Sequence, residues 1–143
     1  MSRTWIDVHR DLYLEDGEKG HLWDGSPNGG PANTPTLLLT TVGRKSGEKR
    51  IMPLIYGKTD DGYVVVASKG GAPQNPDWYF NLEANPAVEL QVINAKFQAD
   101  AETIFGPARQ ALWEKMVSIW PPYADYAKKT EREIPIVLLR LRK

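Results

Sequence analysis

Apolar residues along this 143-residue chain alternate with polar ones or form short runs, and glycine and proline separate these segments. Short apolar or alternating runs between turn residues are typical of β-strands. The pattern predicts six strands, at residues 36–42, 48–58, 63–69, 88–92, 96–105 and 134–141. The valines of the third strand indicate burial on both faces. Pro53, inside the second, indicates a sheet edge or a bulge.

Helical spacing is confined to a few segments. Trp5, Val8 and Leu12 indicate a short amphipathic helix over residues 3–14. The remaining predicted helices are 76–84, with Asn75 as its cap, and a longer one from Gly106-Pro107 to Pro121-Pro122. Residues 123–130 fit a loop or a short helical piece.

Turn residues dominate the other segments. Residues 15–35 are rich in Gly, Pro, Asn and Asp and predict a loop, or an arm that folds over a site. GRKSG (43–47) is a predicted turn, and TDDG (59–62) is a predicted hairpin turn of the Asp-Gly type. Asn94-Ala95 is expected to reverse the chain between the fourth and fifth strands.

The order of these elements predicts an α+β, mainly β fold. A parallel doubly wound sheet needs a helix after each strand, and the first three strands have none between them. We therefore expect an antiparallel barrel with about three packed helices. Neither an internal repeat nor a linker is evident, so residues 1–143 predict a single domain, with 1–35 as its N-terminal helix and arm.

Composition removes several classes of function. The chain has no cysteine, which excludes disulfides, thiolate metal sites and a cysteine nucleophile. Its two histidines, His9 and His21, cannot build a histidine-rich metal site, and we interpret both as surface residues of the arm. No segment approaches the ~20 apolar residues of a membrane helix. The sequence predicts a cytoplasmic protein, and leaves open a peripheral contact with the inner face of the membrane.

A cluster of cations surrounds the first predicted turn. Arg44, Lys45, Lys49 and Arg50 are opposed only by Glu48, in a chain whose formal net charge is +0. A local positive cluster on a neutral protein indicates an anionic ligand of limited size, since nucleic acid usually requires a broader basic surface. The alternative is an ordinary solvated hairpin tip. A small barrel that binds nucleic acid is disfavoured by the pI of about 6.7.

Two common nucleotide-binding motifs are absent from the sequence. The glycines of GRKSG are too close together for a phosphate-binding P-loop, and a strand follows them instead of a helix. No G-x-G-x-x-G follows a predicted strand, which argues against a Rossmann site for a nicotinamide cofactor.

A second group of residues lies further along the chain. ASKGG (67–71) ends the third predicted strand, and its glycine pair would let the backbone approach a ligand closely. Trp78 and Asn81 in NPDWYFN are one helical turn apart. An apolar ring beside an amide suits a flat heteroaromatic ligand, and core packing of Trp78 is the alternative.

The segments LLLTTVGRKSGEKRIMPLIY, VVVASKGGAPQNPDWYFNLEANP and WPPYADYAKKTEREIPIVLL together resemble the deazaflavin-dependent nitroreductase family. The resemblance covers residues 36–139 and implies a split β-barrel of the flavin-binding type. It also implies the deazaflavin coenzyme F420, an obligate hydride donor when reduced, whose phosphodiester and polyglutamate tail would explain the cationic turn.

By this resemblance the cofactor-binding residues are Arg44, Lys45, Arg50, Pro53, Ala67, Ser68, Lys69, Gly70, Gly71, Trp78 and Asn81. Trp120, Tyr123 and Tyr126 are spaced three apart and are expected to cover a planar acceptor, unless they only pack the last helix on the barrel. Ser68, Tyr123 and Tyr126 are the candidate catalytic proton donors.

The expected activity is hydride transfer from reduced F420 to a quinone, a nitroaromatic or another electron-poor small molecule. Met52, Ile55 and Trp120 depart from residues found in other family members, so activation of nitro compounds is not assumed. The alternatives are an FMN-dependent oxidoreductase and a non-catalytic deazaflavin carrier. Both a monomer and a homodimer are compatible with the resemblance.

Overall fold

The computed structural model describes residues 5–142, and its main element is an eight-stranded sheet. The strands run in the order β1-β2-β6-β7-β8-β5-β4, with β3 paired to β2, and every pairing is antiparallel. Their bounds are β1 Leu22–Trp23, β2 Thr34–Val42, β3 Lys49–Ile55, β4 Gly57–Lys58, β5 Gly62–Val66, β6 Ala87–Val92, β7 Ala95–Thr103 and β8 Ile136–Leu141. The antiparallel prediction is confirmed.

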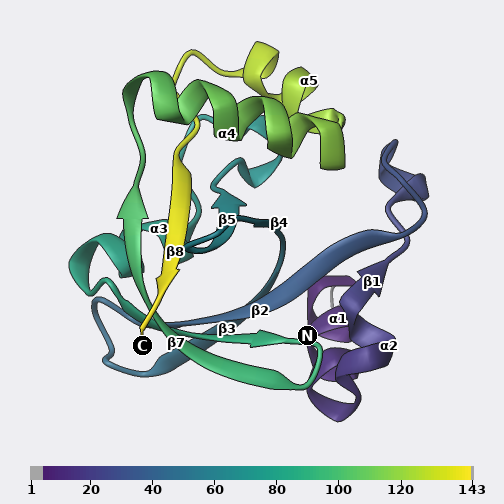
Figure 1. Cartoon of the computed structure of the whole chain (residues 1–143), viewed down its shortest axis with the longest axis vertical. Coiled ribbons are helices and arrows are strands. Elements are labelled where there is room, and N and C mark those ends of the chain that lie inside the picture. Colours follow the sequence, from purple (N-terminus) through teal and green to yellow (C-terminus); the bar gives the residue numbers. More distant parts are fainter. Residues whose placement is uncertain (1–4, 143) are drawn as a thin grey trace.

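The sheet curls into an incomplete barrel with helices around it (Figure 1). α4 and α5 cover one end, and α1 and α2 lie beside the β1–β2 end (Figure 1). α3 lies on the left of the view and contacts β2. The helices are α1 Trp5–Glu15, α2 Gly17–His21, α3 Asp77–Ala84, α4 Gly106–Ile119 and α5 Pro122–Lys129, with 3₁₀ turns η1 Ser26–Asn28 and η2 Lys69–Gly71.

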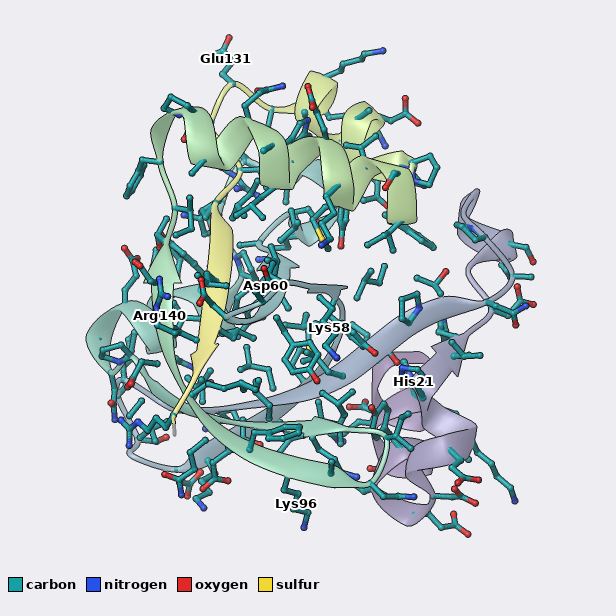
Figure 2. All side chains as sticks on the ribbon, in the orientation of Figure 1. His21, Lys58, Asp60, Lys96, Glu131 and Arg140 are labelled. Carbon is teal, nitrogen blue, oxygen red and sulfur yellow. The ribbon has the colours of Figure 1, made fainter. Side chains whose placement is uncertain are left out.

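The core has two parts because the central strands are buried on both faces. Val65, at 0% exposure, belongs to the cluster inside the curl of the sheet, together with Leu37 and Leu139. Its neighbours Val64 and Val66 point to the other face and pack in the cluster under α4 and α5. Side chains fill the space between α4 and the sheet (Figure 2). The predicted two-sided burial of this strand is confirmed.

The second predicted strand divides in two because the chain changes its pairing partner. β3 pairs with β2, whereas β4 pairs with β5. Within residues 5–142, β3 has no strand on its other side, so Pro53 lies on an edge strand, where its missing N–H leaves no ladder bond unmade. The edge position predicted for Pro53 is confirmed.

Several predicted boundaries are wrong. The third strand ends at Val66 instead of Lys69, and Lys69 begins the 3₁₀ turn η2. Asn75 does not cap α3, since the helix begins after Pro76 without a side-chain cap. The fourth and fifth strands are joined by Ile93-Asn94, one residue earlier than predicted, and β7 ends at Thr103.

The N-terminal arm is more structured than a loop. Asp16 caps α2 by accepting hydrogen bonds from the N–H groups of Glu18 (3.0 Å) and Lys19 (3.4 Å). Gly20 packs on Tyr13 so closely that a Cβ there would lie 2.5 Å from the Tyr13 Cα. The absence of a side chain at this position therefore lets α2 fold back on α1.

Tyr13 fastens this pair of helices to the sheet. Its hydroxyl donates to the carbonyl of Thr36 on β2 (2.9 Å) and accepts from the N–H of Ile93 in the β6–β7 turn (2.7 Å). Burial raises the pKa of Tyr13 to about 12, so the hydroxyl keeps its proton. This anchoring fixes α1 beside β3, where it helps to form the site described next.

Candidate functional site

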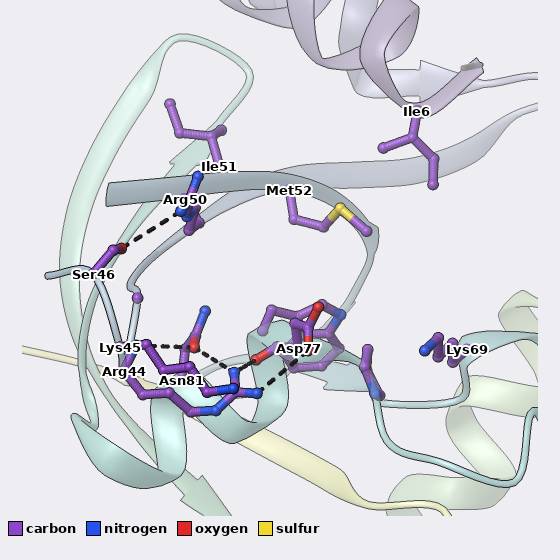
Figure 3. A pocket seen from close by; sticks show the side chains of 13 residues that line it. Ile6, Arg44, Lys45, Ser46, Arg50, Ile51, Met52, Lys69, Asp77 and Asn81 are labelled. Carbon is purple, nitrogen blue, oxygen red and sulfur yellow. Dashed lines mark hydrogen bonds and ion pairs between the residues drawn. The ribbon is translucent and has the colours of Figure 1, made fainter. Parts of the chain in front are cut away.

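A cleft of about 680 Å³ lies between the β2–β3 hairpin and the start of α3 (Figure 3). Its lining residues are Ile6, Gly43, Arg44, Lys45, Ser46, Arg50, Ile51, Met52, Lys69, Pro76, Asp77, Trp78 and Asn81. Cations predominate over the single carboxylate, that of Asp77. The cleft therefore has the electrostatics of an anion-binding site.

Arg44 is held in place by α3. Its Nη1 donates to the Oδ1 of Asn81 (2.9 Å), and its backbone N–H donates to the same oxygen (3.2 Å). Its Nη2 lies 3.5 Å from the Oδ1 of Asp77 (Figure 3). Its guanidinium lies 5.2 Å from the ring centroid of Phe80. This guanidinium is preorganised rather than a freely solvated hairpin tip. Asn81 lines the cleft, and its amide oxygen positions Arg44.

The four cations of the hairpin do not all face the cleft. Lys45 and Arg50 line it, and the Nη2 of Arg50 lies 3.5 Å from both the Oγ of Ser46 and a carboxylate oxygen of Glu48. Lys49 instead pairs with Glu89 on β6 (3.2 Å) and is not part of the lining. Side chains alternate between the two faces along β3, which separates Lys49 from Arg50.

A second, more apolar cavity of about 340 Å³ continues from the cleft toward α5. Its lining residues are Ile6, His9, Trp23, Thr36, Met52, Pro53, Leu54, Ile55, Val66, Ser68, Lys69, Pro76, Trp78, Trp120, Tyr123 and Tyr126. Both spaces share Ile6, Met52, Lys69, Pro76 and Trp78. A ligand with an anionic end and an aromatic end could therefore span both.

The ASKGG segment contributes differently from what was predicted. Ser68 and Lys69 line the site, and Lys69 has a left-handed φ of 47°, which is strained for a residue with a side chain. Ala67 is fully buried and, with Gly71, lines neither of the two spaces. Gly70 lies within η2.

Gly71 is required for packing against α5. Its φ is 81°, and a Cβ there would lie 2.8 Å from the carbonyl oxygen of Tyr126. The structure thus explains this glycine by contact with a helix, where the sequence suggested close approach to a ligand. η2 is held against the element that carries the aromatic residues of the cavity.

The aromatic residues predicted to cover an acceptor all line the cavity, and they also belong to the core. Trp120 and Tyr123 are 5% and 4% exposed, and the rings of Tyr123 and Tyr126 are 6.1 Å apart. Burial raises the pKa of Tyr123, so its hydroxyl stays protonated in the neutral range. Packing of these residues in the core is therefore shown, and their covering of an acceptor stays a prediction.

The arm completes the wall of the cavity. A Cβ at either Gly25 or Gly30 would lie 2.1 Å from the Trp120 ring, so both glycines make room for the indole. Ile6 and Trp23, also from residues 1–35, line the same site. The sequence had suggested an arm that folds over a site without identifying these contact residues.

The prediction that His9 is a surface residue is wrong. His9 is 2% exposed, its Nε2 lies 2.8 Å from the carbonyl oxygen of Gly20, and its ring stacks on Trp23 at 4.1 Å. Burial lowers the pKa of His9, which favours the neutral imidazole. Its spacing of four residues from the buried Tyr13 on α1 is the sequence signal that could have placed it inside.

His21 is half-buried, so it is not a free surface residue either. It points from the end of α2 toward the sheet, and its Nε2 lies 2.7 Å from the hydroxyl of Tyr56 (Figure 2).

Among residues 5–142, no group of three or more His, Asp or Glu side chains is placed to hold a metal ion. In the same part of the chain, no helix is both long and apolar enough to span a membrane.

Comparison with known proteins places this geometry in a family. A family model described as F420H(2)-dependent quinone reductase matches residues 13–140. The F420H(2)-dependent quinone reductase Rv1261c of Mycobacterium tuberculosis is 38% identical over 141 residues, which cover 96% of this chain and 90% of that protein.

Two solved structures agree with this assignment. The F420-H2 dependent reductase FDR-A superimposes with a TM-score of 0.70 and 42% identity, over 74% of this chain and 94% of that chain. A second structure, described as a domain-swapped dimer, has a TM-score of 0.70 and 37% identity, over 91% of this chain and 98% of that one. The fold is that of the split-barrel F420 reductases. The chain belongs to the F420H(2)-dependent quinone reductase family.

Proposed function

We propose that this protein transfers a hydride from reduced coenzyme F420 to a quinone. The observation that carries the proposal is the continuity between a cationic cleft and an aromatic-lined cavity, which matches a cofactor with an acidic tail and a planar ring. Reduced F420 supplies the hydride when bound. The protein has to bind the cofactor and the acceptor, orient them toward each other and exclude water.

The cationic residues would hold the acidic end of the cofactor. Arg44 presents a fixed guanidinium fork that matches phosphate or carboxylate oxygens. Lys45 and Arg50 are exposed and add charge along a flexible tail. Lys69 belongs to both spaces and would neutralise charge near the ring. Pro53 and Trp78 provide apolar walls for the deazaflavin.

The aromatic part of the cavity would hold the acceptor. Trp120, Tyr123 and Tyr126 form a surface for a planar ring, and Trp23 lies in the same lining. Reduction of a quinone requires a proton at the oxygen that gains charge. Ser68, Tyr123 and Tyr126 line this space, and their hydroxyls are the proposed donors. Neutral His9 is not a proton source at neutral pH.

Titration of the purified protein with F420, followed by fluorescence quenching, tests binding. Oxidation of reduced F420 with a soluble quinone such as menadione then tests catalysis. We expect micromolar or tighter binding and quinone-dependent turnover. Failure to bind at low ionic strength would contradict the proposal.

The same experiment separates the alternatives. Binding without turnover over a panel of quinones and nitroaromatics would favour a carrier. Stronger binding of FMN than of F420 would favour an FMN enzyme, because FMN has one phosphate and no glutamate tail. The oligomeric state, monomer or homodimer, and a peripheral membrane contact stay predictions, which light scattering and vesicle sedimentation would test.

A further inference from the structure

We infer that Arg132 is a positioning residue for the cofactor, acting through the segment 67–76; this inference rests on the proposed function. Arg132 lies between α5 and β8 and is not part of the lining of either space. It was not among the predicted site residues. Its guanidinium nonetheless holds the segment that carries Ser68 and Lys69.

The guanidinium makes four hydrogen bonds to one segment. Its Nε donates to the carbonyl of Ala72 (2.9 Å), and its Nη2 donates to the carbonyl of Ser68 (2.8 Å). Its Nη1 donates to the Oδ1 of Asn75 (2.7 Å) and to the carbonyl of Ala67 (3.3 Å). The bonds thus bracket η2 on both sides.

This network explains how an unfavourable backbone is maintained. Lys69 has a φ of 47°, and such a conformation persists only where the surroundings determine it. Arg132 binds the carbonyl of Ser68, the residue before Lys69, and the carbonyl of Ala72, while Gly71 packs on α5. Fixing both ends of η2 directs Lys69 into the junction of the cleft and the cavity.

Only arginine can make this set of contacts. The planar guanidinium has five N–H donors in a fixed fork, whereas the lysine ammonium is a single point on a flexible stem. Within residues 5–142, no carboxylate lies at ion-pair distance from Arg132, so its charge also adds to the positive potential beside Lys69. Arg132→Lys keeps the charge and removes the fork, which separates the two contributions.

Arg109, on α4, is a matched control because it contacts the residues that directly follow Arg132 in the chain. It donates to the carbonyl of Ile134 (2.6 Å) and pairs with Glu133 (3.2 Å), so it fastens the same connection to α4 without touching residues 67–76. If Arg132 is only a structural anchor, Arg109→Ala and Arg132→Ala should change F420 binding to the same extent. If Arg132 positions residues 67–76, only the Arg132 variants should change the exchange of that segment and the F420 dissociation constant.

The test compares Arg132→Lys, Arg132→Ala and Arg109→Ala by hydrogen exchange, by F420 titration and by melting temperature. We expect faster exchange in 67–76, but not in α4, for both Arg132 variants. We also expect a roughly tenfold or greater increase in the F420 dissociation constant. Guanidinium ion added to Arg132→Ala should restore part of the affinity. Arg109→Ala should lower the melting temperature and leave the F420 dissociation constant within about twofold.

Unchanged exchange in 67–76 for Arg132→Lys would overturn the inference, as would equal effects of Arg132→Ala and Arg109→Ala on F420 binding. Arg132→Lys carries the comparison if Arg132→Ala fails to fold. The exchange measurement uses the protein without cofactor. A wild-type protein that ignores F420 would thus refute the proposed function, while exchange would still decide whether Arg132 orders the segment.

Discussion

At the scale of single residues, the site depends on side chains whose neighbours fix them before any ligand arrives. Arg44 is bonded to Asn81 and Asp77, so little conformational entropy is lost when it binds an anion. Lys49 has the same charge in the same hairpin but pairs with Glu89 on the other side. Two residues of the same charge in one hairpin therefore differ in whether they face the cleft.

This difference gives the first prediction. Arg44→Ala combined with Lys45→Ala should raise the F420 dissociation constant by roughly 100-fold, because charge-assisted hydrogen bonds to the tail are lost. Lys49→Ala should change it by less than about twofold. Fluorescence titration of both variants, with circular dichroism to verify folding, makes the comparison. An equal loss in the two would show that overall charge, and not position, governs binding.

The second prediction concerns the proton. At least one of Ser68→Ala, Tyr123→Phe and Tyr126→Phe should lower kcat for quinone reduction by about 100-fold, and the two tyrosine variants should keep their F420 affinity. Because burial raises the pKa of Tyr123, its donor form should persist across the neutral range. Steady-state kinetics with menadione tests this, and three variants of normal kcat would point to water as the donor.

The third prediction follows from the buried imidazole of His9. Its pKa is lowered from the ordinary value of 6.5 by burial, so the unfolded chain takes up the proton more readily. The stability that comes from the neutral ring is complete above that value and is lost as the pH falls toward the folded pKa. We expect the free energy of unfolding to decrease between about pH 7 and about pH 5.

Urea unfolding at several pH values measures this effect. His9→Gln keeps a donor for the carbonyl of Gly20 and does not titrate, so it should flatten the dependence. Burial also lowers the pKa of His21, but His21 is more exposed than His9. His21→Gln should therefore flatten the pH dependence of stability less than His9→Gln does. A slope in His9→Gln equal to that of the wild type would assign the effect to other groups.

At the scale of elements, the N-terminal arm and the α4–α5 connection build the aromatic-lined cavity, the proposed acceptor site, between them. The arm is fastened to the sheet by Tyr13 and to α4 by the fit of Trp120 against Gly25 and Gly30. The cationic cleft, the proposed cofactor site, depends in contrast on the β2–β3 hairpin and α3. The two halves of the site should therefore respond separately to substitution.

Gly30→Ala gives the fourth prediction. The new methyl group would lie 2.1 Å from Trp120, so the indole must move and reshape the cavity. We expect kcat/KM for the quinone to fall about tenfold, with the F420 dissociation constant within about twofold. Asn33→Ala, at an exposed position of the same arm, is the control. A parallel loss of F420 affinity would show that the two halves are coupled.

At the scale of the whole molecule, charge is balanced overall and segregated locally. The formal net charge is +0, and surface ion pairs such as Arg142–Asp100 at 2.7 Å neutralise much of the exterior. The cleft keeps its excess of cations. Attraction of an acidic ligand must then come from this local field and not from the net charge.

The fifth prediction follows from that field. The F420 dissociation constant should rise roughly tenfold between about 0.05 M and about 0.5 M sodium chloride, since salt screens exposed charges. The rise should be smaller for F420 species with fewer glutamates and smallest for a deazaflavin without a tail. Isothermal titration across this series measures it. A salt response independent of tail length would show that the glutamate tail does not interact with the cationic cleft.

Much of the fold follows from local pattern. Alternation in β6 and β7, the valine run of β5 and the turn at residues 59–62 located these strands correctly, with ends that differ by up to three residues, because each signal is local. The η2 turn was missed, since the contacts around it, from Arg132 to Ser68 and from α5 to Gly71, come from residues distant in the sequence. His9 was misplaced because its burial depends on Trp23 and Thr36, which are distant in the sequence.

The sequence by itself determined where most strands lie along the chain, the cationic turn and the aromatic spacing, because periodicity, turn chemistry and charge are properties of neighbouring residues. Only the tertiary structure decided which cations face the cleft, which glycines serve packing and how Arg132 reaches both sides of η2. These depend on contacts between residues far apart in the chain, and the curl of the sheet brings them together.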